Sequence, residues 1–179
     1  MKPLQTLTRF DAFLATRGLE LDAVVIGGAA LVLLGVVDRV TRDCDVLQPD
    51  LPLPIAEAAI AFAVETRKGG DELADDWLNN GPSALIKALE PGWEGRVVRL
   101  FTGRALRLSV PGRSDLLCSK LWALCDRLTD FDDCVALAPS AAELAAVLPW
   151  LEVQDLNPDW PQHVREQLDR LRRTLGHGL

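Results

Sequence analysis

The sequence lacks a long uninterrupted hydrophobic segment. Its longest apolar run, residues 23–37, is too short to span a bilayer and is interrupted by glycines. The first residues also lack the charged region and hydrophobic core of a secretory signal. These two absences predict a cytoplasmic protein that does not associate with membranes.

Cysteine and histidine are also scarce. The 179 residues include four cysteines and two histidines, and no two cysteines have Cys-x-x-Cys spacing. Neither a zinc site nor a disulfide framework is therefore indicated. We expect reduced and mostly buried thiols, because all four cysteines lie within apolar patterns. Nothing in the sequence places a histidine beside a cysteine as a nucleophile pair.

Positive charge is in deficit. The sequence has 19 lysines and arginines but 26 aspartates and glutamates, which gives a net charge of −7. This balance argues against broad, non-specific nucleic-acid binding, which needs a basic surface. A local basic groove stays open as an alternative to solvated surface charge. Its candidates fall on one predicted hairpin: Arg96, Arg99, Arg104 and Arg107.

The hydrophobic pattern predicts an α+β fold. Apolar residues make up 49% of the chain, which is enough for a sizeable core. We expect one domain over residues 1–179, with a sheet-containing core over about 1–111 and a helical part over about 112–179. The core would hold a small mixed β-sheet with helices on one side. Periodicity, turns and caps predict strands over 23–27, 43–47, 96–101 and 105–110, and helices over 3–17, 29–35, 55–66, 83–89, 117–135 (one helix, or two joined near Thr129), 140–150 and 161–175.

The stretch from Val24 to Leu47 is the most informative. Its last residues alternate polar and apolar, as a half-buried strand does. Alternation would place Thr41, Asp43 and Asp45 on one face. Two carboxylates on one strand face repel each other unless a cation or a proton lies between them. The opposite face would point to the core with Val40, Cys44 and Val46.

Gly27 and Gly28 join the first predicted strand of this stretch to a short helix. Glycine lets the main chain approach a ligand closely, and N–H groups at a helix start attract phosphate oxygens. The turn therefore predicts a phosphate cradle near the two aspartates. The alternatives are a tight turn with no ligand, and aspartates at a solvated strand end that pair with Arg39 or Arg42.

These residues resemble the signature of the nucleotidyltransferase (polymerase-beta-like) superfamily. The chain has Gly27-Gly28 followed by Arg39-x-Thr41-x-Asp43-x-Asp45. This form is similar to a minimal bacterial branch of uncharacterised proteins that are related to abortive-infection toxin nucleotidyltransferases. Later segments extend the resemblance over nearly the whole chain: Trp77-Leu-Asn79, Pro91-Gly-Trp93, Arg113-x-Asp115-Leu-Leu-x-x-Lys120-Leu-x-Ala123-x-x-Asp126-Arg127, Asp130-x-x-Asp133 and Asp155-x-Asn157-Pro158.

The resemblance implies a metal site and a nucleotide site. Asp43 and Asp45 would hold Mg²⁺, or Mn²⁺ in its place, with a nucleoside triphosphate as substrate. Main-chain N–H groups of Gly27 and Gly28 would contact the triphosphate. Further implied residues are Lys120 in a catalytic role, and Arg39, Thr41, Arg113 and Arg127 at the nucleotide. The alternative for Lys120 and Arg127 is a set of ion pairs with Asp115, Asp126 or Asp130, and for Trp77 and Trp93 it is core packing.

One departure from the resemblance concerns a third carboxylate. Active members of the superfamily usually carry one on a later strand, often as the general base. The candidate strand over residues 105–110 has none. The resemblance to toxin-like branches offers Asp130 or Asp133 as a replacement.

Two classes of function follow. The first is an Mg²⁺-dependent nucleotidyltransferase that acts on RNA, a protein or a small molecule, in the role of a toxin with an antitoxin partner. The second is a degenerate nucleotide-binding or protein-interaction module that has kept the fold. A purely structural helical protein would bind no nucleotide at all.

Overall fold

The computed structural model describes residues 1–177. The chain forms two compact units. The first contains residues 1–87 and 91–112, and the second contains residues 88–90 and the chain from Arg113 onward. Within the described residues, no helix combines the length and the apolar character that crossing a membrane requires.

The first unit is built on a five-stranded mixed sheet. Its strand order is β3-β2-β1-β5-β4. The strands are β1 (Leu21–Ile26), β2 (Cys44–Gln48), β3 (Leu78–Asn79), β4 (Val98–Thr102) and β5 (Leu106–Val110). The helices of this unit are α1 (Pro3–Thr16), α2 (Gly27–Leu33), α3 (Leu53–Lys68) and two 3-10 turns, η1 (Ser83–Lys87) and η2 (Trp93–Arg96).

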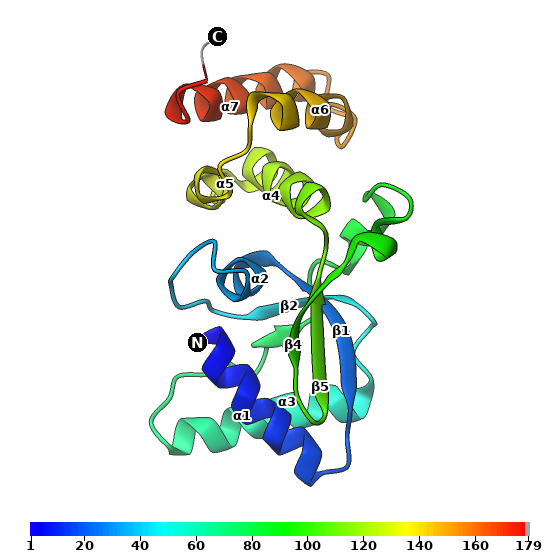
Figure 1. Cartoon of the computed structure of the whole chain (residues 1–179), viewed down its shortest axis with the longest axis vertical. Helices are drawn as coiled ribbons and strands as arrows, with labels where there is room; N and C mark the ends of the chain where they lie inside the picture. Colours follow the sequence, from blue (N-terminus) through cyan, green and yellow to red (C-terminus); the bar gives the residue numbers. More distant parts are fainter. Residues whose placement is uncertain (178–179) are drawn as a thin grey trace. The chain divides into compact units, whose positions relative to one another are not determined.

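Strand directions follow from the connections between the strands. β1 runs antiparallel to β2 and parallel to β5, while β4 and β5 form an antiparallel hairpin. β2 runs parallel to β3, because α3 makes the crossover that a parallel pair requires. The predicted α+β class with a small mixed sheet is confirmed, and Figure 1 shows the sheet with α1 and α3 close together.

Aromatic side chains fill the core between α1, α3 and β3. Trp77 is fully buried, and its ring meets that of Phe10 edge-on at a centroid distance of 5.0 Å. The Phe62 ring lies 5.2 Å from that of Phe10 and 5.8 Å from that of Trp77. The indole N–H donates to the Ala59 carbonyl at 3.0 Å, which satisfies the buried polar atom. Trp77 is therefore a core residue, as is Trp93, of which 3% is exposed.

Asp11 joins α1 to the β4–β5 hairpin. Its carboxylate accepts main-chain N–H groups of Arg104 (3.1 Å), Ala105 (2.8 Å) and Leu106 (2.8 Å). A Cβ on Gly103 would lie 2.1 Å from this carboxylate, so the approach requires glycine there. Burial alone would raise the pKa of Asp11, but the three N–H donors outweigh it and hold that pKa below its ordinary value.

Replacement of Asp11 by alanine should cost about 3 kcal/mol of stability, because three main-chain donors lose a charged acceptor. Urea denaturation measures the loss. Asp71→Ala, which removes only an exposed pair with Arg9, should cost less than about 1 kcal/mol. Since the folded-state pKa of Asp11 is depressed, its contribution is present above about pH 4 and is lost as pH falls through that pKa. Equal losses in the two variants would contradict the assignment.

The second unit is helical. Its helices are α4 (Arg113–Arg127), α5 (Phe131–Leu137), α6 (Ala141–Leu151) and α7 (Trp160–Thr174). The pattern over residues 117–135 is thus two helices, and Leu128 between them has a left-handed φ of 59° that ends α4. Ser140 and Glu143 form the predicted capping box at the start of α6.

Candidate functional site

The Gly27–Gly28 turn and Asp45 lie together in the first unit. β1 ends at Ile26, whose register partner on β2 is Asp45. Gly27 follows with a φ of +76°, a conformation that favours glycine. A Cβ built on Gly27 would lie 2.5 Å from Oδ2 of Asp45. The carboxylate thus occupies the space that any side chain at position 27 would need.

Arg39 and Thr41 lie beside the second glycine. A Cβ on Gly28 would lie 3.3 Å from Cγ2 of Thr41 and 3.4 Å from Nη2 of Arg39. Thr41 is buried, and its hydroxyl donates to the Asp43 carbonyl at 3.1 Å. Thr41 therefore fixes the main chain that carries Asp43. The structure brings Gly27, Gly28, Arg39, Thr41 and Asp45 to one place, with Asp43 two residues before Asp45.

The predicted alternation before β2 is wrong in part. β2 begins at Cys44, and residues 40–43 precede it without regular strand structure. Val40 was expected in the core, yet 65% of it is exposed, and Thr41 is buried instead. Without ladder hydrogen bonds nothing imposes a period of two on these residues. The alternation applies from Cys44 onward, where Cys44 and Val46 are fully buried.

Asn79 is the neighbour of Asp45 in the sheet, and no motif in the sequence marks it as a candidate site residue. β3 pairs in parallel with β2, and the register partner of Asp45 is Asn79. The side chain of Asn79 accepts from the Gly81 main-chain N–H at 2.6 Å and donates to the Asp76 carbonyl at 3.2 Å. The segment Trp77-Leu-Asn79 was the available signal, although its two paired residues are too few to display alternation.

Three of the four cysteines, Cys44 in the first unit and Cys125 and Cys134 in the second, are buried. Cys44 is fully buried, and burial first, with the charges of Asp45 and Asp43 adding to it, raises the pKa of its thiol. Burial also raises the pKa of Cys125 and Cys134 to about 12. Buried, protonated thiols are poor nucleophiles, as the sequence predicts for core cysteines.

Two of the four candidate arginines of the hairpin, Arg99 and Arg107, form ion pairs with carboxylates. Arg99 donates to Asp22 through both terminal guanidinium nitrogens, Nη1 at 2.7 Å and Nη2 at 3.1 Å. Arg107 donates to Asp22 at 3.2 Å and to Glu20 at 3.1 Å. These contacts support the interpretation that the two arginines are solvated surface charges and not part of a basic groove. The carboxylates beside them offset their positive charge.

Lys120 lies in the second unit at the centre of a buried ion-pair cluster. Its Nζ lies 2.8 Å from Oδ1 of Asp130 and 2.7 Å from Oδ2 of Asp133. The lysine is 5% exposed, and Arg127 adds an outer pair with Asp130 at 3.2 Å. Burial alone would lower the pKa of Lys120, but its hydrogen bonds to the two aspartates raise it. The cluster joins α4 to α5.

Arg113, at the start of α4, also has internal contacts. Its Nε donates to Glu143 at 2.8 Å and its Nη2 to the Leu137 carbonyl at 2.9 Å. The hydrogen bond from Arg113, together with donors from Ser140, lowers the pKa of Glu143 to about 2. Arg113 thus links three helices of the second unit.

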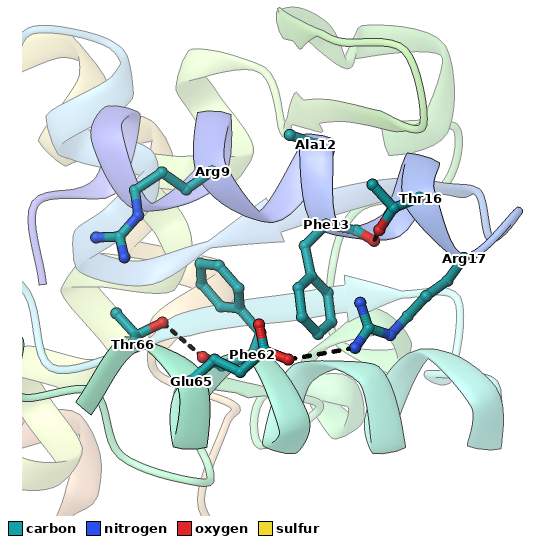
Figure 2. Close-up of a pocket in the computed structure, with 8 residues that line it drawn as sticks. All are labelled: Arg9, Ala12, Phe13, Thr16, Arg17, Phe62, Glu65 and Thr66. Carbon is teal, nitrogen blue, oxygen red and sulfur yellow. Dashed lines mark hydrogen bonds and ion pairs between the residues drawn. The ribbon is translucent and has the colours of Figure 1, made fainter. Parts of the chain in front are cut away.

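A hollow of about 520 Å³ lies between α1 and α3 (Figure 2). Phe13 and Phe62 line it, with Arg9 and Arg17 near its two ends. Arg17 lies over the Phe13 ring, 3.4 Å from its centroid, and reaches Glu65 at 3.5 Å. The residues that line this hollow are distinct from those at the Gly27–Gly28 turn.

Comparison with known proteins identifies the family. No curated protein and no solved structure matches the chain. A family model described as a nucleotidyltransferase of unknown function (DUF6036) matches residues 2–165, which contain the turn and both aspartates. The chain therefore belongs to this family of nucleotidyltransferases of unknown function.

Proposed function

We propose that the chain is an Mg²⁺-dependent enzyme that moves a nucleoside monophosphate from a nucleoside triphosphate to an acceptor. The contact between Asp45 and the Gly27 position carries the proposal. It puts a carboxylate beside the main chain of the turn, and the family to which the chain belongs supports the reaction class.

The donor set at the turn fits a hard cation. Carboxylate oxygens are ligands that Mg²⁺ and Mn²⁺ prefer, and Asp43 and Asp45 would supply them. When bound, the metal neutralises charge on the triphosphate and stabilises the leaving pyrophosphate. Within residues 1–177, no group of three or more acidic, histidine or cysteine side chains is placed to hold a metal ion.

The other residues of the turn would bind and orient the nucleotide. Gly27 and Gly28 admit phosphate oxygens to their main-chain N–H groups, since neither carries a side chain. Arg39 supplies a fixed cation beside Gly28 for a phosphate oxygen. Thr41 holds the Asp43 carbonyl and thereby positions the neighbouring carboxylate. The roles of Lys120, Arg113 and Arg127 in binding phosphate stay predictions. In the structure each of these side chains makes ion pairs within the second unit.

Label transfer tests the proposal. The purified chain is incubated with Mg²⁺ and each α-labelled nucleoside triphosphate, with total RNA, cell protein and small metabolites as separate acceptors. We expect one acceptor class to take up label, and Asp43→Asn/Asp45→Asn to reduce uptake by at least roughly a hundredfold. Asp50→Asn/Glu57→Gln removes the same charge at exposed positions and should leave uptake unchanged. Transfer to RNA or protein would fit the toxin role, and reversal by a neighbouring gene product would identify an antitoxin.

A nucleotide-binding module without turnover is the second candidate, and the amide of Asn79 beside Asp45 favours it. Calorimetric titration of the same nucleotides distinguishes the two. Saturable, Mg²⁺-dependent binding without label transfer would support the module. Neither heat nor transfer would overturn both candidates together with the site.

A further inference from the structure

We infer that Asn79 is the third residue of the Asp43–Asp45 site and that its neutral amide limits how tightly the nucleotide-free chain binds a divalent cation. This inference rests on the proposed function. Asp45 and Asn79 are register partners on neighbouring parallel strands. Strands in a sheet lie about 4.8 Å apart, and partners in register project to the same face. The two side chains are therefore neighbours on that face.

The side-chain oxygens of this pair fill the space that a Cβ would need at two glycines. A Cβ on Gly27 would lie 2.5 Å from Oδ2 of Asp45, and a Cβ on Gly81 would lie 2.8 Å from Oδ1 of Asn79. Any other residue at either position would press on a side-chain oxygen. At each glycine the main chain thus passes close to one oxygen of the pair, a carboxylate oxygen at Gly27 and a neutral amide oxygen at Gly81.

The hydrogen bonds of Asn79 leave its oxygen able to accept again. Oδ1 accepts the Gly81 N–H at 2.6 Å, and a carbonyl oxygen has two lone pairs. An amide oxygen is an accepted ligand for hard cations, but it brings no charge. The acidic set then carries two negative charges instead of three. Since affinity for such cations rises with the number of charged ligands, the cation would bind mainly together with a triphosphate, whose oxygens add the missing charge.

Titration of the nucleotide-free full chain with Mn²⁺ tests this inference, with calorimetry as the readout. Asn79→Asp should tighten Mn²⁺ binding by about tenfold or more, because it adds a carboxylate next to Asp45. The substitution keeps an oxygen that can accept the Gly81 N–H, and thermal melting checks that the fold is retained. Asn79→Ala removes the oxygen and should weaken Mn²⁺ binding several-fold.

Thr102→Asp is the matched control. It adds the same charge at an exposed position of β4, the opposite edge of the sheet from β3, and should leave Mn²⁺ binding unchanged. Binding that is lost in Asp43→Asn/Asp45→Asn but unaffected by both Asn79 variants would overturn the inference and leave the proposed function intact. Equal tightening in Thr102→Asp would also overturn it, as a general charge effect. Absence of Mn²⁺ binding in both the wild type and Asn79→Asp would overturn the site itself.

Discussion

Gly27→Ala should abolish most of the proposed activity while the protein remains folded. The new methyl group would lie 2.5 Å from Oδ2 of Asp45, so either the carboxylate or the turn must move. A displacement of about 1 Å at a reacting centre can cost roughly a hundredfold in rate. We expect a loss of that order in label transfer, and a corresponding loss in nucleotide affinity by calorimetry.

The backbone conformation of Gly27 contributes to the cost, and a second glycine isolates that contribution. Gly18 has a similar φ of +64°, but a Cβ there would meet nothing within 4 Å. Gly18→Ala should therefore cost only the backbone strain, about 1 kcal/mol, with transfer unchanged. If Gly27→Ala transfers label as well as Gly18→Ala does, then the contact with Asp45 has no part in the activity.

Lys120→Met should destabilise the protein by about 3–5 kcal/mol, because it leaves the carboxylates of Asp130 and Asp133 buried without their cation. Chemical denaturation measures the change. Arg127→Ala removes only the exposed outer pair with Asp130 and should cost less than about 1 kcal/mol. Lys120→Met/Asp133→Asn should recover part of the loss, since it removes one of the two buried carboxylate charges that the lysine no longer offsets.

The pH dependence of this loss is a further check. Burial alone would raise the pKa of Asp130, but the bond from Lys120 outweighs it and lowers that pKa. The contribution of Asp130 is thus present above about pH 4 and disappears as pH falls through its folded-state pKa. The gap between wild type and Lys120→Met should narrow there, and a gap independent of pH would contradict the ion-pair account.

Local patterns predicted the elements that depend on neighbouring residues. The strand before Gly27, the β4–β5 hairpin and the Ser140–Glu143 capping box follow from alternation, turn chemistry and cap spacing, which act over a few residues. The closeness of Gly27 and Asp45 agrees with the prediction that the glycine turn lies near the aspartates.

Contacts between segments that are distant in the sequence leave no local pattern of this kind. Asp11 meets the main chain of Ala105, and no local pattern links an acidic residue of an amphipathic helix to a hairpin more than 90 residues away. β3 consists of Leu78 and Asn79, which cannot display a period of two. The partner strand, β2, defines their place in the sheet, so Asn79 could be placed beside Asp45 only once the pairing was known.

The position of β1 in the sheet has a consequence for synthesis on the ribosome. Its neighbours are β2, which follows soon after it, and β5, which ends at Val110. At about 5–20 residues per second, roughly 4–17 s pass between the synthesis of β1 and the synthesis of β5. During that interval one edge of a strand rich in valine and isoleucine has no pairing strand, and such an edge invites pairing with other chains. The nascent first unit is therefore most exposed to aggregation just before its hairpin emerges.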